Sequence, residues 1–190
     1  MKALVTGAAK RLGRSMAIYL ARRGFDIAIH YHSSEKEAES LYYEIKDMGR
    51  KCSLLKANFL DEVQVRGLVK RAINMLGGPI NCLINNASIF EYDTIKCATR
   101  EGWDRHMESN LRAPFVLSQE FAIQAPKVFF DRKKEAKSQA LIINVVDQRV
   151  RNLTTDFTSY SLAKMGLWTL TEISAMSLAP DVRVNAIGPG

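Results

Sequence analysis

A tyrosine and a lysine, Tyr160 and Lys164, lie four residues apart in a segment with a helical pattern. Residues at this spacing share one face of a helix, so the phenol and the ammonium group are expected to lie close together. A nearby cation favours the phenolate and lowers the tyrosine pKa. A tyrosine tuned in this way can pass a proton to a substrate near neutral pH. The spacing alone is common, and an ordinary surface pair is the alternative.

The chain begins with the pattern of a nucleotide-binding turn. A short apolar segment, 2–5, is expected to form a buried strand, and a helical pattern starts at Leu12. Gly7 lets the backbone between them turn tightly and approach phosphates, and Gly13 lets the helix pack close to the strand. The helix N-terminus supplies free N–H groups and partial positive charge. Arg11 stands where a middle glycine is often found, so an ordinary glycine turn is the alternative.

Strand and helix patterns alternate along the whole chain. The expected strands are short apolar runs over 2–5, 25–31, 51–57, 80–84, 140–146 and 182–187. The expected helices have one apolar face and cover 12–23, 34–48, 61–76, 103–110, 114–124 and 159–178. This alternation implies right-handed crossovers and a parallel sheet covered by helices on both faces. We therefore predict a single α/β domain over residues 1–190, built on a doubly wound parallel sheet.

Local signals add detail to this arrangement. Ser34-Glu35-Lys36-Glu37 has the pattern of a capping box that opens the second helix. The charged stretch 131–137 is predicted to be a solvated helix end or a loop. Ligands of such sheets bind beyond the carboxyl ends of the strands. The residues that follow the predicted strands are polar or glycine: Gly7, His32, Asn58, Asn85, Asp147 and Gly190.

The composition is that of an ordinary globular protein. Of its residues, 47% are hydrophobic and 25% are charged, and no apolar run is long enough to span a membrane. Three widely separated cysteines argue against a disulfide framework and a zinc site, and favour a reducing cytoplasm. The net charge of +7 is scattered, so it favours a basic cofactor pocket over a nucleic-acid surface. His30 and His32 lack nearby carboxylates, so no metal site is expected.

Several motifs occur together in an order that resembles the short-chain dehydrogenase/reductase family: Thr6-Gly7-x3-Arg11-x-Gly13, Asn85-Asn86-Ala87, Asn110, Tyr160-x3-Lys164 and Pro189-Gly190. The resemblance implies a Rossmann-type fold and a nicotinamide cofactor. It implies Tyr160 as the proton donor, and Lys164 as the residue that bonds the nicotinamide ribose and tunes Tyr160. Asn110 would hold a proton-relay water, and Asn86 and Ala87 would support the cofactor.

Departures from the family pattern resemble the pteridine reductase branch. The family usually has serine where this chain has Asp147, and glycine where it has Ser88. The residues of the turn and the end of the second strand, His30-Tyr31-His32-Ser33-Ser34, also match that branch, although Ser33 stands where the branch often has arginine and Asn58 replaces a common aspartate.

This closer resemblance implies that Phe90 stacks on a pterin ring, and that Ser88 and Arg11 reach both the pterin and the cofactor. It also implies that Asp147 works with Tyr160 to protonate a ring nitrogen. An imine nitrogen is more basic than a carbonyl oxygen, so a carboxyl-and-tyrosine relay is a suitable acid. Alternatively, Asp147 is a helix N-cap or a partner of Arg149, and Phe90 packs within a loop.

NADPH rather than NADH is the predicted cofactor. NAD-specific sites usually place an acidic residue after the second strand, where it accepts a hydrogen bond from the ribose 2′-OH. Here His32, Ser33 and Ser34 follow that strand, and Arg11 lies in the turn. Their hydroxyl, imidazole and guanidinium groups suit a 2′-phosphate. The predicted cofactor site comprises Gly7, Lys10, Arg11, Leu12, Gly13, His32, Ser33, Ser34, Asn58, Phe59, Leu60, Asn86, Ala87, Ser88, Tyr160, Lys164, Pro189 and Gly190.

The predicted function is NADPH-dependent reduction of a C=N bond in a pterin such as a dihydropteridine or dihydrofolate. The predicted catalytic residues are Asn110, Asp147, Tyr160 and Lys164, and the predicted substrate site comprises Arg11, Ser88, Phe90, Asp147 and Tyr160. One alternative is a general carbonyl reductase acting on an oxoacyl thioester, a sugar or a ketone. Another is a nucleotide-binding regulatory protein that has lost catalysis. The resemblance also implies a homotetramer, and a C-terminal strand and substrate loop that this sequence lacks.

Overall fold

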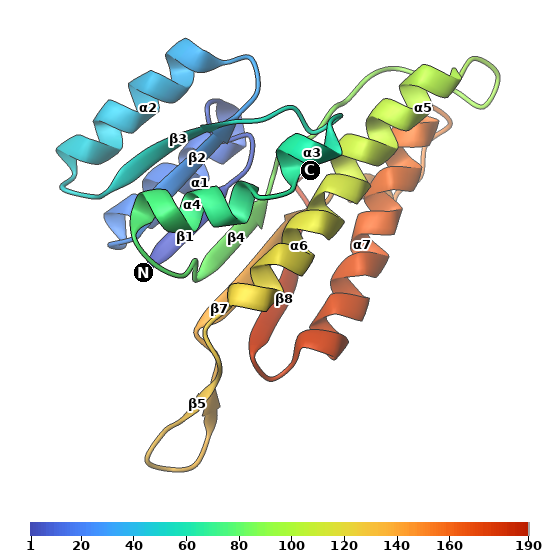
Figure 1. Ribbon diagram of the computed structural model, residues 1–190. Coiled ribbons are helices and arrows are strands. Elements are labelled where there is room, and N and C mark those ends of the chain that lie inside the picture. The colour runs from blue at the N-terminus through green and yellow to red at the C-terminus, as the bar shows by residue number, and fades with distance from the viewer. Residues whose placement is uncertain (190) are drawn as a thin grey trace.

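A six-stranded parallel sheet forms the centre of the computed structural model, which describes residues 1–189 (Figure 1). The order of the strands reverses between β1 and β4, and each neighbouring pair is parallel. The predicted doubly wound sheet is therefore confirmed. In the order β3-β2-β1-β4-β7-β8, the strands are β3 (Cys52–Lys56), β2 (Asp26–Tyr31), β1 (Lys2–Val5), β4 (Cys82–Asn85), β7 (Ala140–Val145) and β8 (Val182–Ile187).

Helices cover both faces of this sheet. Alternate residues of a strand point to opposite faces, so Val5 belongs to one apolar core and Leu4 to the other. None of the helices within the described residues has both the length and the apolar character needed to cross a membrane. The core around Val5 lies under α1 (Arg11–Arg22) and α2 (Glu35–Asp47), and the core around Leu4 lies under α4 (Leu68–Leu76), α6 (Ala113–Gln124) and α7 (Thr158–Leu178).

Two of the predicted helices begin where the sequence places them but differ in detail. The helix expected over 61–76 is divided into α3 (Glu62–Val65) and α4. At the break, Gly67 has a left-handed backbone with φ of 79°, and its N–H donates to Glu120 Oε1 at 2.7 Å. The predicted capping box of α2 does not form, since the side chain of Ser34 makes no capping hydrogen bond to the described residues. The break depends on a contact with α6, which the local pattern does not contain.

One continuous helical stretch replaces the two helices predicted over 103–124. α5 (Arg100–Met107) passes into a π-helical turn, η1 (Glu108–Arg112), and then into α6. α5 begins at Arg100 rather than at Trp103, because the Thr99 hydroxyl caps it by accepting the N–H of Gly102 at 3.0 Å. Single π-turns inside helices often occur at functional sites, and this one carries the predicted residue Asn110.

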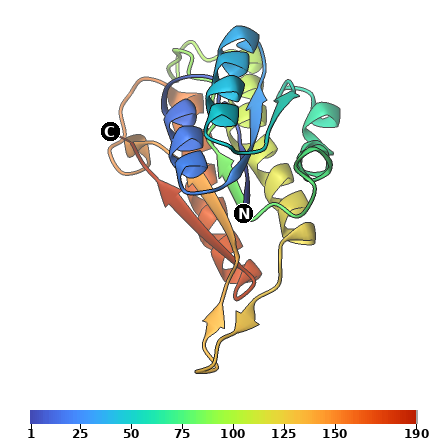
Figure 2. The ribbon, with the colours of Figure 1, turned by 90° about the vertical axis from the view of Figure 1, so that its left-hand side faces the viewer.

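The charged stretch 131–137 belongs to a β-hairpin, where the sequence predicts a solvated helix end or a loop. β5 (Phe129–Phe130) pairs with β6 (Ala136–Lys137) in antiparallel register, and Figure 2 shows the hairpin projecting from the body of the protein. A carboxylate of Asp131 holds the tip by accepting two backbone N–H groups, at 2.8 and 3.0 Å. The hairpin lies at the amino end of β7, away from the carboxyl edge of the sheet.

Candidate functional site

A cavity of about 560 Å³ opens at the carboxyl edge of the sheet, beside the reversal of strand order. The segments that follow β1, β2, β3, β4 and β7 all contribute to its wall. The wall brings together many of the predicted residues: Gly7, Lys10, Arg11, Leu12, Gly13, His32, Asn58, Phe59, Leu60, Asn86, Ala87, Ser88, Phe90, Asp147 and Tyr160. It also contains residues outside the predicted set: His30, Ala57, Ile89, Ser109 and Arg149.

The remaining predicted residues surround this wall. Lys164 and Asn110 are buried behind it. Ser33 and Ser34 follow His32 at the start of α2. The carbonyl oxygen of Pro189 accepts the N–H of Gln148 at 3.3 Å, which places the end of β8 beside the Asp147 segment. Gly190, the last predicted cofactor residue, lies outside the described residues.

The two glycines of the turn are required because its backbone packs closely against neighbouring segments. Gly7 has a φ of 60°, and a Cβ atom there would lie 2.9 Å from Ala87 Cα. A Cβ at Gly13 would lie 2.3 Å from the Gly7 oxygen, so α1 packs against the turn as the sequence predicts. Within the described residues, no side chain caps the N-terminus of α1. Its first N–H groups and its positive end therefore suit an anion such as a dinucleotide pyrophosphate.

Two side chains fix this turn to the end of β4. The Thr6 hydroxyl accepts the N–H groups of Asn86 and Ala87 at 2.9 and 3.0 Å. In return, the Asn86 amide donates to the carbonyl oxygens of Thr6 and Gly7, at 2.8 and 3.2 Å. Asn86 and Ala87 thus hold the turn against the end of β4, and their support of a cofactor stays a prediction.

A buried histidine supports the same turn from the other side. His30 Nδ1 accepts the Gly7 N–H at 3.1 Å, so Nε2 carries the proton and donates to the Ala57 carbonyl, also at 3.1 Å. The His30 ring stacks on Phe59, with their centroids 4.2 Å apart. Burial lowers the pKa of His30 to about 4, so the imidazole is neutral at pH 7. The sequence shows only its place at the end of a predicted strand, two residues before His32.

Basic side chains line the cavity near α1 and α2. Lys10, Arg11 and His32 all line it, and all three are exposed. Lys10 Nζ pairs with Glu37 Oε1 at 2.7 Å, which ties the turn to α2. Together these groups offer positive charge and donors to a phosphate bound between the turn and the end of β2. They fit the predicted 2′-phosphate of NADPH.

Asp147 connects the two sides of the predicted catalytic centre. The Tyr160 hydroxyl donates to Asp147 Oδ2 at 2.8 Å. Asp147 Oδ1 accepts the backbone N–H of Arg149 at 2.9 Å and pairs with its guanidinium group at 3.4 Å. The alternatives for Asp147, an N-cap and a partner of Arg149, are therefore both realised on one oxygen. The other oxygen accepts from Tyr160, so the structural contacts leave it available for the predicted catalytic role.

The electrostatics of Tyr160 differ from the sequence prediction. Burial and the hydrogen bond to the Asp147 carboxylate raise the pKa of Tyr160 well above its usual value, whereas the sequence predicts that Lys164 lowers it. Lys164 Nζ lies 5.7 Å from the centre of the Tyr160 ring and donates to the Val145 carbonyl at 2.8 Å. Burial lowers the pKa of Lys164 to about 8. Tyr160 is thus an acid that keeps its proton at neutral pH.

Phe90 forms one side of the cavity beside these groups. One face of its ring stacks on Phe157, with centroids 4.2 Å apart and planes 15° apart, and its edge meets Tyr160 at 4.7 Å. The guanidinium carbon of Arg149 lies 5.4 Å from the centre of the same ring. Phe90 nevertheless stays 51% exposed, so it packs within its loop and still offers surface to a flat ligand.

Asn110 holds the loop that carries Ser88 and Phe90. Its side-chain oxygen accepts the Ile89 N–H, and its amide donates to the Ile89 carbonyl, both at 2.8 Å. The Ser88 hydroxyl donates to the same carbonyl at 3.3 Å. Asn110 is fully buried in the π-turn η1, and these bonds satisfy its polar side-chain atoms there. A relay water on Asn110 stays a prediction.

Comparisons with known proteins agree with this geometry. The family model described as short chain dehydrogenase matches residues 1–190. The crystal structure of FolM alternative dihydrofolate reductase 1 from Brucella suis in complex with NADP is 38% identical, with a TM-score of 0.90, over 100% of this chain and 74% of that one. A blue fluorescent protein from a metagenomic library, in complex with NADPH, is 32% identical, with a TM-score of 0.90, over 100% and 73%. The 3-oxoacyl-[acyl-carrier-protein] reductase FabG of Staphylococcus aureus is 29% identical, over 99% of this chain and 73% of its own.

Proposed function

The chain belongs to the short-chain dehydrogenase/reductase family and is an NADP-dependent oxidoreductase, and on this premise we propose that it reduces a C=N bond of a pterin. The observation that carries the proposal is the hydrogen bond from Tyr160 to the Asp147 carboxylate, next to the partly exposed ring of Phe90. This arrangement offers a proton and a flat apolar surface to the same ligand. The similarity to a dihydrofolate reductase of the FolM type supports the same substrate class.

The cofactor site follows from the geometry of the turn. Gly7, Gly13 and the N-terminus of α1 would hold the pyrophosphate, and Arg11 and His32 would contact the 2′-phosphate. When bound, NADPH supplies the hydride that adds to the carbon of the C=N bond. Lys164 would bond the nicotinamide ribose through a second donor of its ammonium group, which has three, one of them directed to the Val145 carbonyl.

The chain's own residues would complete the reaction by protonation. The Tyr160 hydroxyl would give its proton to the nitrogen of the C=N bond. Asp147 would orient that hydroxyl and help to replace the proton from solvent at the cavity mouth. Phe90 would hold the pterin ring flat, so that the acceptor carbon and the donor carbon meet at reacting distance. Each role uses a contact already present in the cavity wall.

A general carbonyl reductase is the second candidate function. The similarity to an oxoacyl thioester reductase of the FabG type favours it, since that protein aligns over almost the whole chain. Tyr160 and Lys164 would serve a ketone equally well, because protonation of a carbonyl oxygen needs the same acid. Asp147 and Phe90 distinguish the two candidates, since only the pterin reaction gives both of them a direct role.

Substrate competition tests the proposed function. We expect the protein to oxidise NADPH rapidly with a dihydropterin or dihydrofolate, and slowly with a 3-oxoacyl thioester or a simple ketone, because Phe90 and Asp147 favour a flat nitrogen heterocycle. Absorbance at the nicotinamide band, with a reaction lacking substrate as control, measures kcat/KM for each. A larger kcat/KM for the ketone or thioester would transfer the assignment to the carbonyl reductase.

A homotetramer is the second proposal that follows from family membership. α6 and α7 carry apolar side chains on their outer faces, and closed symmetry is the rule for homo-oligomers. We expect light scattering at micromolar concentration to give four times the chain mass, and Met176→Glu on α7 to reduce it. Val63→Glu on α3 is the matched control, since Val63 is also exposed. A monomeric wild-type protein would refute the proposal. The exposed large apolar residues of α6 and α7 are Ile123, Leu162, Met165, Ile173 and Met176.

A further inference from the structure

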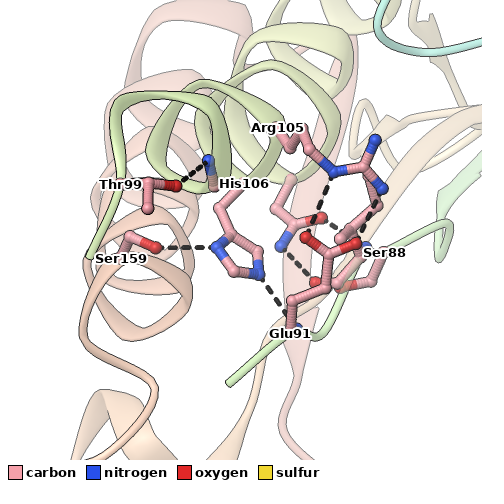
Figure 3. A network of polar contacts seen from close by, with 9 residues as sticks. Ser88, Glu91, Thr99, Arg105, His106 and Ser159 are labelled. Carbon is pink, nitrogen blue, oxygen red and sulfur yellow. Dashed lines mark hydrogen bonds and ion pairs between the residues drawn. The ribbon is translucent and has the colours of Figure 1, made fainter. Parts of the chain in front are cut away.

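A buried polar network joins the loop of Phe90 to the start of α7. His106, on α5, is 1% exposed and lies between Glu91 and Ser159, as Figure 3 shows. His106 Nε2 contacts the Glu91 N–H at 3.1 Å, and His106 Nδ1 contacts the Ser159 hydroxyl at 2.7 Å. The Ser159 hydroxyl in turn donates to the carboxylate of Asp93. Glu91 is thereby linked through the imidazole to Ser159 of α7, and Asp93 is bonded to Ser159 directly.

The partners of this network fix the direction of every hydrogen bond. A backbone N–H can only donate, so His106 Nε2 must accept from Glu91. The proton of the neutral ring therefore lies on Nδ1, which donates to the Ser159 oxygen. Asp93 accepts a hydrogen bond from the Ser159 hydroxyl. Its two carboxylate oxygens also accept the Ser159 backbone N–H, at 3.2 and 3.3 Å. The hydrogen bonds thus run in one direction, because His106 donates to Ser159 and Ser159 donates to Asp93.

The charge state of His106 agrees with this assignment. Burial lowers the pKa of His106 below its ordinary value, and it outweighs the carboxylates of Asp93 and Glu91, which raise the pKa. The guanidinium group of Arg105, paired with Glu91 at 2.7 Å, acts in the same direction as burial. The edge of the Tyr160 ring also packs against the imidazole, 6.0 Å between centres. The imidazole is therefore neutral at pH 7, as an acceptor at Nε2 requires.

Two residues of the network are sequence neighbours of groups in the proposed reaction. Glu91 follows Phe90, and Ser159 precedes Tyr160. Asp93 strengthens the same link, because its carbonyl accepts the Phe157 N–H at 2.7 Å, and the Phe157 ring supports Phe90. Phe157 has a φ of 59°, a backbone conformation that such a residue rarely adopts without support. The link between loop and helix therefore sets where Phe90 and Tyr160 lie relative to each other.

We propose that His106 is a positioning residue that holds Phe90 and the Tyr160 hydroxyl in register for the reaction, acting through Glu91 and Ser159. The proposal rests on the proposed role of Tyr160 as the proton donor, for any substrate of this cavity. His106 does not line that cavity within the described residues, so it acts without touching substrate or cofactor. A misplacement of about 1 Å at reacting groups can cost on the order of 100-fold in rate, so a remote clamp of this kind controls turnover.

Nitrogen NMR of the imidazole groups tests the geometry without any assay of activity. The chain has three histidines, and its two buried ones are expected to have opposite tautomers at pH 7. His106 should carry its proton on Nδ1, and His30, which accepts from Gly7 at Nδ1, should carry it on Nε2. His30 is thus an internal control. A His106 ring protonated on Nε2, or on both nitrogens, at pH 7 would overturn the proposal.

Kinetics of matched variants test the role. His106→Phe and Ser159→Ala break the chain of donors, and we expect each to lower kcat about 10-fold or more and to raise the substrate KM, with the NADPH Kd unchanged. His106→Asn keeps a donor toward Ser159, and Ser159→Thr keeps the hydroxyl, so both should recover most turnover. Thr99→Ala is the control, because it removes the N-cap of the same helix and should lower Tm while leaving kcat intact.

All rates are compared with the wild type on whichever substrate the wild type reduces fastest. The test of His106 is therefore equally valid if the substrate is a ketone, so a failure of the pterin proposal does not refute the positioning role. Folded His106→Phe and Ser159→Ala proteins with the wild-type kcat and KM would refute the positioning role. If His106→Phe does not fold, the Ser159 pair decides: no difference in kcat between Ser159→Ala and Ser159→Thr gives the same negative result.

Discussion

Replacing Tyr160 with phenylalanine is expected to lower kcat by about 10²–10⁴-fold, the usual contribution of a positioned acid. The substitution keeps the ring that packs against Phe90 and His106 and removes only the hydroxyl that donates to Asp147. The turn that fits the cofactor phosphates lies on other elements, so NADPH affinity should change little. Steady-state NADPH oxidation measures kcat, and fluorescence titration measures the NADPH Kd.

Tyr92→Phe is the matched control for this prediction. Tyr92 lies in the same loop region as Phe90, but it is 66% exposed, and its hydroxyl lies 3.5 Å from Asp156. Removal of that hydroxyl should leave kcat near the wild-type value. If Tyr160→Phe retained wild-type turnover while Tm and NADPH affinity were normal, Tyr160 would not be the acid of this reaction.

The charge state of Tyr160 also predicts how turnover depends on pH. Because its pKa is raised by burial and by Asp147, Tyr160 keeps its proton throughout the neutral range, and the acid form is the one that reduction needs. Lys164, with a pKa lowered to about 8, is the group that titrates first as the pH rises. We therefore expect turnover to fall as the pH rises past about 8, because Lys164 loses its proton there while Tyr160 keeps its own.

The sequence predicts the sheet well because its strands are short apolar runs with no competing pattern. The alternation of Leu4 and Val5 between two cores is a property of any buried strand, so the local sequence suffices. The break at Gly67 depends instead on the Glu120 side chain of α6, far along the chain. The hairpin tip depends on Asp131 binding two backbone N–H groups, which a run of charged residues does not reveal.

The candidate site shows the same division. Gly7, Gly13 and the Tyr160 spacing are visible in the sequence because they belong to local turns and one helix face. The contacts of His30 with Gly7 and of Arg149 with the Phe90 ring are not, because they arise from residues brought together by folding. The prediction that Lys164 lowers the pKa of Tyr160 fails for the same reason. It considers one neighbour on the helix, whereas burial and the carboxylate of Asp147, from the segment after β7, raise the pKa of Tyr160.

Substitution of Asp147 is expected to separate the two candidate functions. Asp147→Ala should lower pterin turnover about 100-fold or more, since the carboxylate orients and resupplies the Tyr160 proton. Because residues of one relay act as a unit, the double variant with Tyr160→Phe should be little slower than Tyr160→Phe alone. Asp147→Asn keeps an acceptor for the Arg149 N–H and removes the charge, so equal losses in the alanine and asparagine variants assign the effect to the charge.

Asp147→Ser then tests the branch of the family, because serine is the residue usual for the family at this position. A serine hydroxyl can bond a carbonyl oxygen but cannot resupply a proton as a carboxylate does. We therefore expect kcat/KM to fall more for a dihydropterin than for a ketone, measured on the same preparation. Asp104→Ala removes an exposed carboxylate on α5 and should change neither value. A parallel fall for both substrates would show that Asp147 serves only the architecture of the cavity, because Arg149 and the Tyr160 hydroxyl would then lose a common anchor whatever the substrate.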